Sequence, residues 1–225
     1  MHPQGPPQQV PSSARRPRMH SSNHQQQVWL VGSSVLCQAA RYVAQGPVGL
    51  GLMLNQAELI WHGHDNLKWS EFGHLLCQLI VTSAPPDVLL VHMDAFELAT
   101  SSFQVLAQQA VDSLLDFDRR NPNCRIIWSE TLPCFAYPGS IAQMTMEQVR
   151  INYNVMCSKL VLSLGGQVIK HTDIKPETPA LFDRDKMHLS DLGNNIFLNN
   201  LRRGLAYLLC EPDTKIYCAS DSRTF

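Results

Sequence analysis

Short apolar runs alternate along the chain with longer segments in which apolar residues recur every three or four positions. The runs predict buried strands, and the longer spacing predicts helices with one buried face. The five predicted strands are residues 28–31, 58–61, 87–93, 124–128 and 167–170. The helices predicted between and after them are residues 39–44, 69–79, 103–117, 146–164 and 192–209.

This alternation predicts an α/β protein. Parallel strands need long crossover connections, which are usually helical and right-handed. We therefore expect one domain over residues 28–210, a three-layer α/β/α sandwich around a five-stranded parallel sheet. Ligands of such sheets bind at the carboxyl ends of the strands, so the segments that follow the strands are the candidate site.

Both ends of the chain differ from this pattern. Residues 1–27 are rich in Pro, Gln and Ser and have few apolar side chains to offset the entropy of ordering, which predicts a disordered tail. Residues 211–225 are polar and predict a frayed C-terminal tail. Inside the domain, Gly165 and Gly166 follow the helix predicted over 146–164 and predict its C-cap.

Composition narrows the class of protein. Hydrophobic residues make up 44% of the 225 and charged residues 16%, which is typical of a packed core. A net charge of -1 gives no indication of a nucleic-acid or membrane partner. We find no bilayer-spanning run and no apolar signal-peptide segment at the N-terminus. Seven cysteines without CxxC spacing indicate free thiols. We therefore expect an intracellular, cytoplasmic protein, and no protein partner is indicated.

Three residues suggest nucleophilic catalysis. Ser34 lies where the first strand meets the first helix, where the helix dipole favours negative charge on an attacking oxygen. His188 is the candidate base. Asp185 precedes it by three residues, so one short turn presents both side chains and the carboxylate orients the imidazole. The alternative is structural: a serine at this place is usually a helix N-cap, and His188 is then an ordinary loop residue.

The segment around Ser34 resembles the SGNH/GDSL hydrolases, a family of lipases, esterases and acetyl-ester hydrolases. Residues 31–35 resemble the G-D-S-L block, with Ser33 where Asp is usual and Ser34 at the nucleophile. Residues 185–190, followed by Gly193 and Phe197, resemble the terminal D-x-x-H-L-S block. The resemblance covers residues 28–209. It implies the flavodoxin-like SGNH fold, a small acyl-ester substrate, and no cofactor or metal, with His188 as base and Asp185 as its partner.

A narrower resemblance is to a divergent SGNH-like branch of vertebrate genomes, often seen in retroelement-related reading frames. It rests on residues 128–133, which read Trp-Ser-Glu-Thr-Leu-Pro, and on Gly165 and Gly166.

The middle blocks depart from the family pattern. The glycine whose N–H helps to hold the oxyanion aligns near Asn66 or Asp65, and Asn tolerates the left-handed backbone better than most residues. The Asn side chain that donates to the oxyanion is replaced by Phe96, and the block's glycine by Asp94. Losing one such donor typically costs about 10²–10³ in turnover. The sequence predicts a Ser–His–Asp triad with a degraded oxyanion hole, in a slow or inactive esterase; the alternative is a non-catalytic SGNH-like binding module.

Other polar residues have structural interpretations. Asp94 and Glu97 are expected at a solvated strand end and Phe96 in the core. His62 and His64 lie two apart, as on one face of a strand, but no third ligand has metal-site spacing, so no metal is predicted. His92, in an apolar run, is expected as a core histidine bonded to a neighbour.

Overall fold

A six-stranded sheet forms the centre of the structure. The structure is a computed structural model and describes residues 25–45, 57–137 and 143–219. Every neighbouring pair of strands is parallel, and the spatial order is β2-β1-β3-β4-β5-β6. The strands are β1 (Gln26–Gly32), β2 (Ala57–Gly63), β3 (Val88–His92), β4 (Arg125–Ser129), β5 (Gln167–Lys170) and β6 (Ile216–Cys218).

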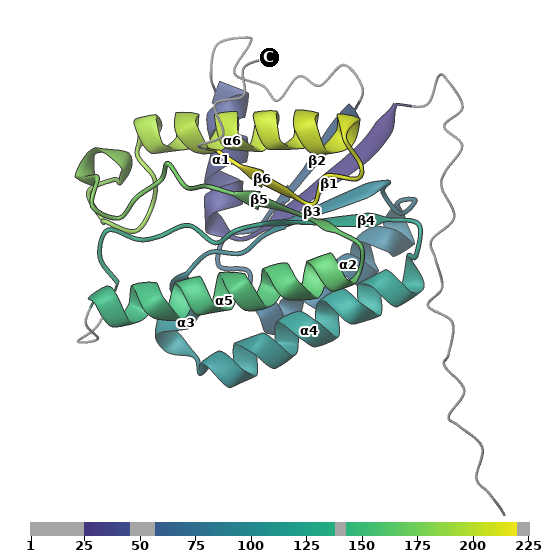
Figure 1. The fold of residues 1–225 in the computed structure, drawn as a ribbon, viewed down its shortest axis with the longest axis horizontal. Helices are drawn as coiled ribbons and strands as arrows, with labels where there is room; N and C mark the ends of the chain where they lie inside the picture. The colour runs from purple at the N-terminus through teal and green to yellow at the C-terminus, as the bar shows by residue number, and fades with distance from the viewer. Residues whose placement is uncertain (1–24, 46–56, 138–142, 220–225) are drawn as a thin grey trace, which may run out of the picture.

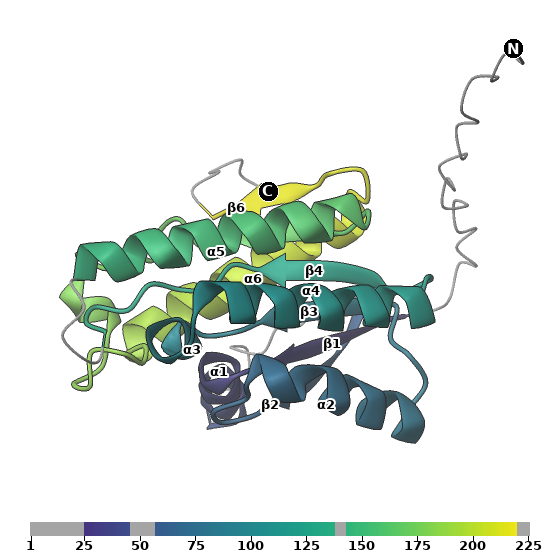
Figure 2. The same cartoon turned by 90° about the horizontal axis from the view of Figure 1, so that it is seen from below.

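Helices cover both faces of this sheet. Figure 1 shows α1 and α6 on one face and α2, α4 and α5 on the other, and the turned view in Figure 2 agrees. The predicted three-layer α/β/α architecture is therefore confirmed. The helices are α1 (Ser34–Gln45), α2 (Trp69–Thr82), α3 (Phe96–Thr100), α4 (Phe103–Arg120), α5 (Gln143–Ser163) and α6 (Asp191–Cys210), with a 3-10 turn at Pro179–Leu181. No helix in the described ranges has the length and apolar character needed to cross a bilayer.

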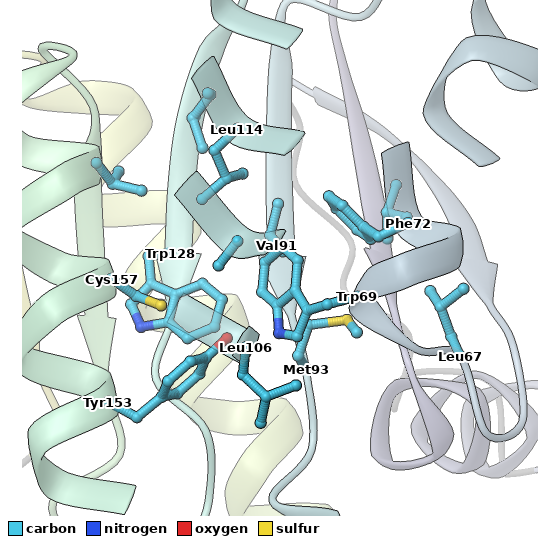
Figure 3. Close-up of a cluster of buried hydrophobic side chains, with 14 of the residues drawn as sticks. Leu67, Trp69, Phe72, Val91, Met93, Leu106, Leu114, Trp128, Tyr153 and Cys157 are labelled. Atoms are coloured by element: carbon cyan, nitrogen blue, oxygen red, sulfur yellow. The ribbon is translucent and has the colours of Figure 1, made fainter. Parts of the chain in front are cut away.

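Alternate residues of the central strands feed two separate cores. In β1, Trp29 and Val31 join the core under α2, α4 and α5, whereas Val28 and Leu30 join the core under α1 and α6. Burial on both faces explains why these strands are continuous apolar runs rather than alternating ones. In the larger core, the ring of Trp128 lies 6.3 Å from that of Trp69 and 6.2 Å from that of Tyr153 (Figure 3).

The prediction of five strands is wrong, because β6 pairs in parallel with β5. This strand lies within residues 211–225, which the sequence predicts as a polar tail. It has three residues, too few to show a pattern, and only Tyr217 is buried. At the other end, β1 begins at Gln26, two residues earlier than expected, while residues 1–24 of the predicted tail lie outside the described residues.

Two helix ends bear directly on the sequence predictions. Helix α1 begins at Ser34, five residues earlier than the periodicity indicated, so Ser34 is a helical residue. Helix α5 ends as predicted at the glycine pair. Gly165 has a φ of 76°, and Gly166 donates its N–H to the Val161 carbonyl at 2.9 Å, which is the hydrogen bond of a Schellman C-cap.

Candidate functional site

The segment that follows β1 is bonded to the segment that follows β3. Ser33 donates its N–H to the His92 carbonyl at 3.2 Å, and its hydroxyl accepts the Asp94 N–H at 2.7 Å. Gly32 permits this approach, because a Cβ at that position would lie 1.9 Å from the His92 oxygen. The hydroxyl of Ser33 thus joins two loops at the carboxyl edge of the sheet, a role that the sequence did not indicate.

The side chain of Ser34 faces the segment after β2. Its Oγ accepts a hydrogen bond from the backbone N–H of Asn66 at 3.1 Å. Asn66 has a φ of 58°, in the left-handed region that Asn tolerates better than most residues. The Ser34 hydroxyl is therefore bound to another segment and does not cap its own helix.

His188 and Asp185 form a hydrogen-bonded pair in the loop before α6. The His188 Nδ1 lies 2.5 Å from Asp185 Oδ2, and Asp185 Oδ1 accepts the N–H groups of Met187 and His188, both at 2.9 Å. Partial burial acts to raise the pKa of Asp185, but these three hydrogen bonds outweigh it and lower that pKa to about 2. The carboxylate is therefore ionised at neutral pH and orients the ring, which leaves Nε2 as the nitrogen able to take a proton.

One cavity of about 200 Å³ brings the predicted residues together. Ser34, Asn66, Asp94, Phe96 and His188 all line it, and Asp185 holds His188 from behind. Within the described residues, no hydrogen bond joins the Ser34 hydroxyl to the His188 ring. Hydrogen bonds between catalytic groups are often long or unformed before substrate binds, so this geometry is compatible with transfer of the serine proton to His188.

Asp94 is not a solvated strand end. Its Oδ2 accepts the backbone N–H of Ser34 at 3.3 Å, and its Oδ1 accepts that of Phe96 at 3.1 Å. Two donors hold the carboxylate at the start of α1, beside the Ser34 side chain.

Phe96 and Glu97 also differ from their predicted surroundings. Phe96 is 42% exposed and forms part of the cavity wall. In the short helix α3 it is Leu98 that packs into the core. Glu97 is half-buried: its carboxylate accepts the Trp69 N–H at 2.9 Å, at the start of α2. Burial raises the pKa of Glu97, against the opposing effect of that hydrogen bond.

His62 and His64, near the end of β2, and His92, at the end of β3, differ in their surroundings. His62 packs edge-on against Trp29, with ring centroids 5.2 Å apart, and His64 is exposed. Among the described residues, no group of three His, Cys, Asp or Glu side chains is arranged to hold a metal ion. His92 is fully buried and its Nδ1 lies 3.0 Å from Ser129 Oγ, as expected for a bonded core histidine. The same Oγ lies 2.8 Å from Nε2 of His171, a buried partner that the sequence analysis missed.

Comparison with known proteins gives matches in structure only. No family model matches the chain, and no curated protein matches its sequence. The chain is similar to a GDSL-like lipase from Bacteroides thetaiotaomicron, with a TM-score of 0.63 and 11% identity over 81% of this chain and 89% of that chain. It is also similar to the lipase/acylhydrolase from Enterococcus faecalis (TM-score 0.56, 14% identity, 81% and 96% covered) and to an acetyl xylan esterase (TM-score 0.57, 16% identity, 80% and 99% covered).

These matches define the class of the fold. The chain has the α/β fold of the SGNH/GDSL hydrolases, as its two end motifs indicated. At such low identities the likeness establishes the fold alone, and function has to be argued from the site. The narrower resemblance to a vertebrate retroelement-related branch is not tested by these matches and stays a prediction.

Proposed function

We propose that this protein is a slow ester hydrolase of the SGNH type, with Ser34 as nucleophile, His188 as general base and Asp185 as the group that orients His188. The observation that supports this most is that Ser34 and His188 line the same cavity while Asp185 holds the far nitrogen of His188. The Asp185 carboxylate stabilises the positive charge that forms on the His188 ring when its Nε2 accepts the serine proton.

The proposed reaction has two halves. Ser34 Oγ attacks the acyl carbonyl carbon as its proton passes to His188 Nε2, and the carbonyl electron pair moves onto oxygen. When this electron pair re-forms the carbonyl, the bond to the alcohol oxygen breaks and the alcohol leaves with the proton from His188. The acyl group then remains on Ser34. Water then attacks the acyl group with the same proton transfers and releases the acid.

The low rate follows from the donors around the developing oxyanion. The N–H groups of Asn66 and Ser34 are the candidates, but the Ser34 N–H already donates to the Asp94 carboxylate. Phe96 offers no side-chain donor. Because one missing donor costs about 10²–10³ in turnover, and a nearby anion opposes an oxyanion further, we expect hydrolysis to be slow.

Hydrolysis of p-nitrophenyl acetate by the purified protein tests this proposal. We expect a rate above that of Ser34→Ala, and a rate unchanged by Ser83→Ala, a matched serine variant at the exposed end of α2. Equal rates for the wild type and Ser34→Ala would contradict the hydrolase.

A non-catalytic binding module is the second candidate, and the hydrogen bond between Asp94 and the Ser34 N–H favours it. An activated phosphonate probe separates the two functions, because it labels a serine only when that serine can attack. A fluorophosphonate that labels the wild type but not Ser34→Ala would contradict the binding module; no labelling, together with no hydrolysis, would support it.

A further inference from the structure

The charge of Asp94 is fixed in position inside the cavity. Its two oxygens accept different backbone N–H groups, those of Ser34 at 3.3 Å and Phe96 at 3.1 Å, so rotation of the side chain would break at least one of these bonds. The Asp94 N–H is itself bonded to Ser33 Oγ at 2.7 Å, which fixes the backbone below it. A ligand in this cavity therefore meets a carboxylate that stays beside Ser34.

The other charged side chains around the cavity either lie outside its wall or have a partner of opposite charge. Asp185 does not line the cavity and is hydrogen-bonded to the far nitrogen of the His188 ring. Lys68 lines the cavity together with Glu97, and its charge acts to lower the Glu97 pKa, so the two interact with opposite charge. Asp94 is the charge nearest to the Ser34 backbone, and the half-exposed ring of Phe96 lies next to it in the wall.

We propose that this cavity is selective for esters that carry an ammonium group within a few bonds of the carbonyl, with Asp94 as the residue that determines this specificity. The inference rests on the proposed hydrolysis at Ser34. In the complex, the Asp94 carboxylate pairs with the cation and the face of Phe96 packs against it.

Two physical effects favour such a substrate. A fixed carboxylate next to the reacting carbonyl repels the oxyanion that forms from a neutral ester, whereas a cation bound to that carboxylate cancels the repulsion as the charge develops. An aromatic face also attracts a cation, more strongly when water is excluded. Leu67, Leu132 and Met187 give the cavity apolar walls, which strengthen both effects by lowering the local dielectric constant.

A pair of isosteric esters tests the inference. Acetylcholine and 3,3-dimethylbutyl acetate have the same shape and differ by the positive charge, and release of acetate from each is followed by NMR. We expect the wild type to hydrolyse acetylcholine with a kcat/KM about tenfold higher. In Asp94→Asn the preference should fall to within about a factor of two, because the amide keeps the size of the side chain and loses its charge.

Two further variants make the result specific to the cavity. Asp116→Asn removes the same charge from the exposed surface of α4, where Asp116 pairs with Arg120, and should keep the preference. Phe96→Leu keeps an apolar wall without an aromatic face and should reduce the preference about threefold. No preference in the wild type, or the same preference in folded Asp94→Asn, would overturn the inference.

Equilibrium binding separates this inference from the proposed function. If neither ester is hydrolysed above the Ser34→Ala rate, the hydrolase proposal fails, but the cavity can still be tested with choline and its neutral isostere 3,3-dimethylbutanol by calorimetric titration. Tighter binding of choline by the wild type, lost in Asp94→Asn, supports the cation-selective cavity. Equal or undetectable binding of the two compounds overturns it.

Discussion

The backbone N–H of Ser34 donates a hydrogen bond to the Asp94 carboxylate across 3.3 Å. In the proposed reaction this N–H would stabilise the oxyanion, so the protein carries its own anion at that donor. The carboxylate also accepts the Phe96 N–H, and this second bond helps to hold it in place. The oxyanion of a substrate must displace this carboxylate from the Ser34 N–H, or it is stabilised by fewer hydrogen-bond donors.

Replacing Asp94 and Phe96, the two residues that depart from the family pattern after β3, should increase esterase activity. The double substitution Asp94→Gly with Phe96→Asn removes the internal anion and adds a side-chain donor in the cavity wall. We expect kcat/KM for p-nitrophenyl acetate to rise about 10²-fold. The gain should disappear when Ser34→Ala is added to the same protein. A folded double variant with the wild-type rate would show that these two positions do not limit the reaction.

Removing the charge of Asp185 should impair the reaction without unfolding the protein. In Asp185→Asn the imidazole is no longer held by a carboxylate, and we expect hydrolysis to fall at least about 10²-fold, measured as p-nitrophenol release. Because the Asp185–His188 pair is partly exposed, Tm should change little. Asp183→Asn, in the same loop, is the matched control and should retain the wild-type rate. A comparable loss in both variants would indicate damage to the loop rather than loss of the orienting group.

The left-handed backbone of Asn66 should decide which substitutions it accepts. Its φ is 58°, and the group that contacts Ser34 is the backbone N–H. Asn66→Gly should therefore keep stability and activity, whereas Asn66→Ala should lower the free energy of unfolding by about 1 kcal/mol relative to glycine. Urea denaturation of the two variants measures the difference. An alanine variant as stable as the glycine variant would mean that the position does not need this conformation.

Two buried histidines should make the protein less stable in mild acid. Burial lowers the pKa of His92 to about 4, and burial together with the charge of His92 lowers the pKa of His171. Below pH 6.5 the unfolded chain binds protons at these positions while the folded protein does not, so stability present above pH 6.5 is lost as the pH falls. His92 alone should cost about 2 kcal/mol between pH 6.5 and 4.5.

Urea denaturation over that pH range measures the loss. The slope of unfolding free energy against pH should be shallower in His171→Gln, which removes one of the two groups. The exposed His64→Gln should run parallel to the wild type. Parallel curves for all three proteins would mean that His171 does not contribute to the acid sensitivity.

Much of the architecture could be predicted because its signals are local. The apolar runs at β1, β3 and β4 are buried on both faces, and such runs separated by helical periods leave few arrangements other than a parallel sheet between two helical layers. Gly165 at the end of α5 was equally clear, since a left-handed C-cap favours glycine. The burial of His92, the last residue of β3, was likewise expected from its apolar neighbours.

The surroundings of residues 94–97 could not be predicted from the sequence in the same way. Phe96 was expected in the core because it is apolar, yet the direction of its side chain depends on the start of α3 and on which residue of that turn meets α5. Glu97 was expected in solvent because it is charged, yet it accepts the N–H at the start of α2. The surroundings of both residues depend on contacts with segments distant in the chain, and such contacts produce no periodic pattern in the sequence.

The sequence by itself determined the layered α/β fold and the identity of the residues at its carboxyl edge, because periodicity and short motifs are properties of neighbouring residues. Only the tertiary structure decided that Ser34 and His188 line one cavity and that the Asp94 carboxylate accepts the Ser34 N–H. It also decided that residues 216–218 add a sixth strand. These depend on hydrogen bonds between segments far apart in the chain, and such bonds form only where the packed helices and strands bring donor and acceptor within about 3 Å.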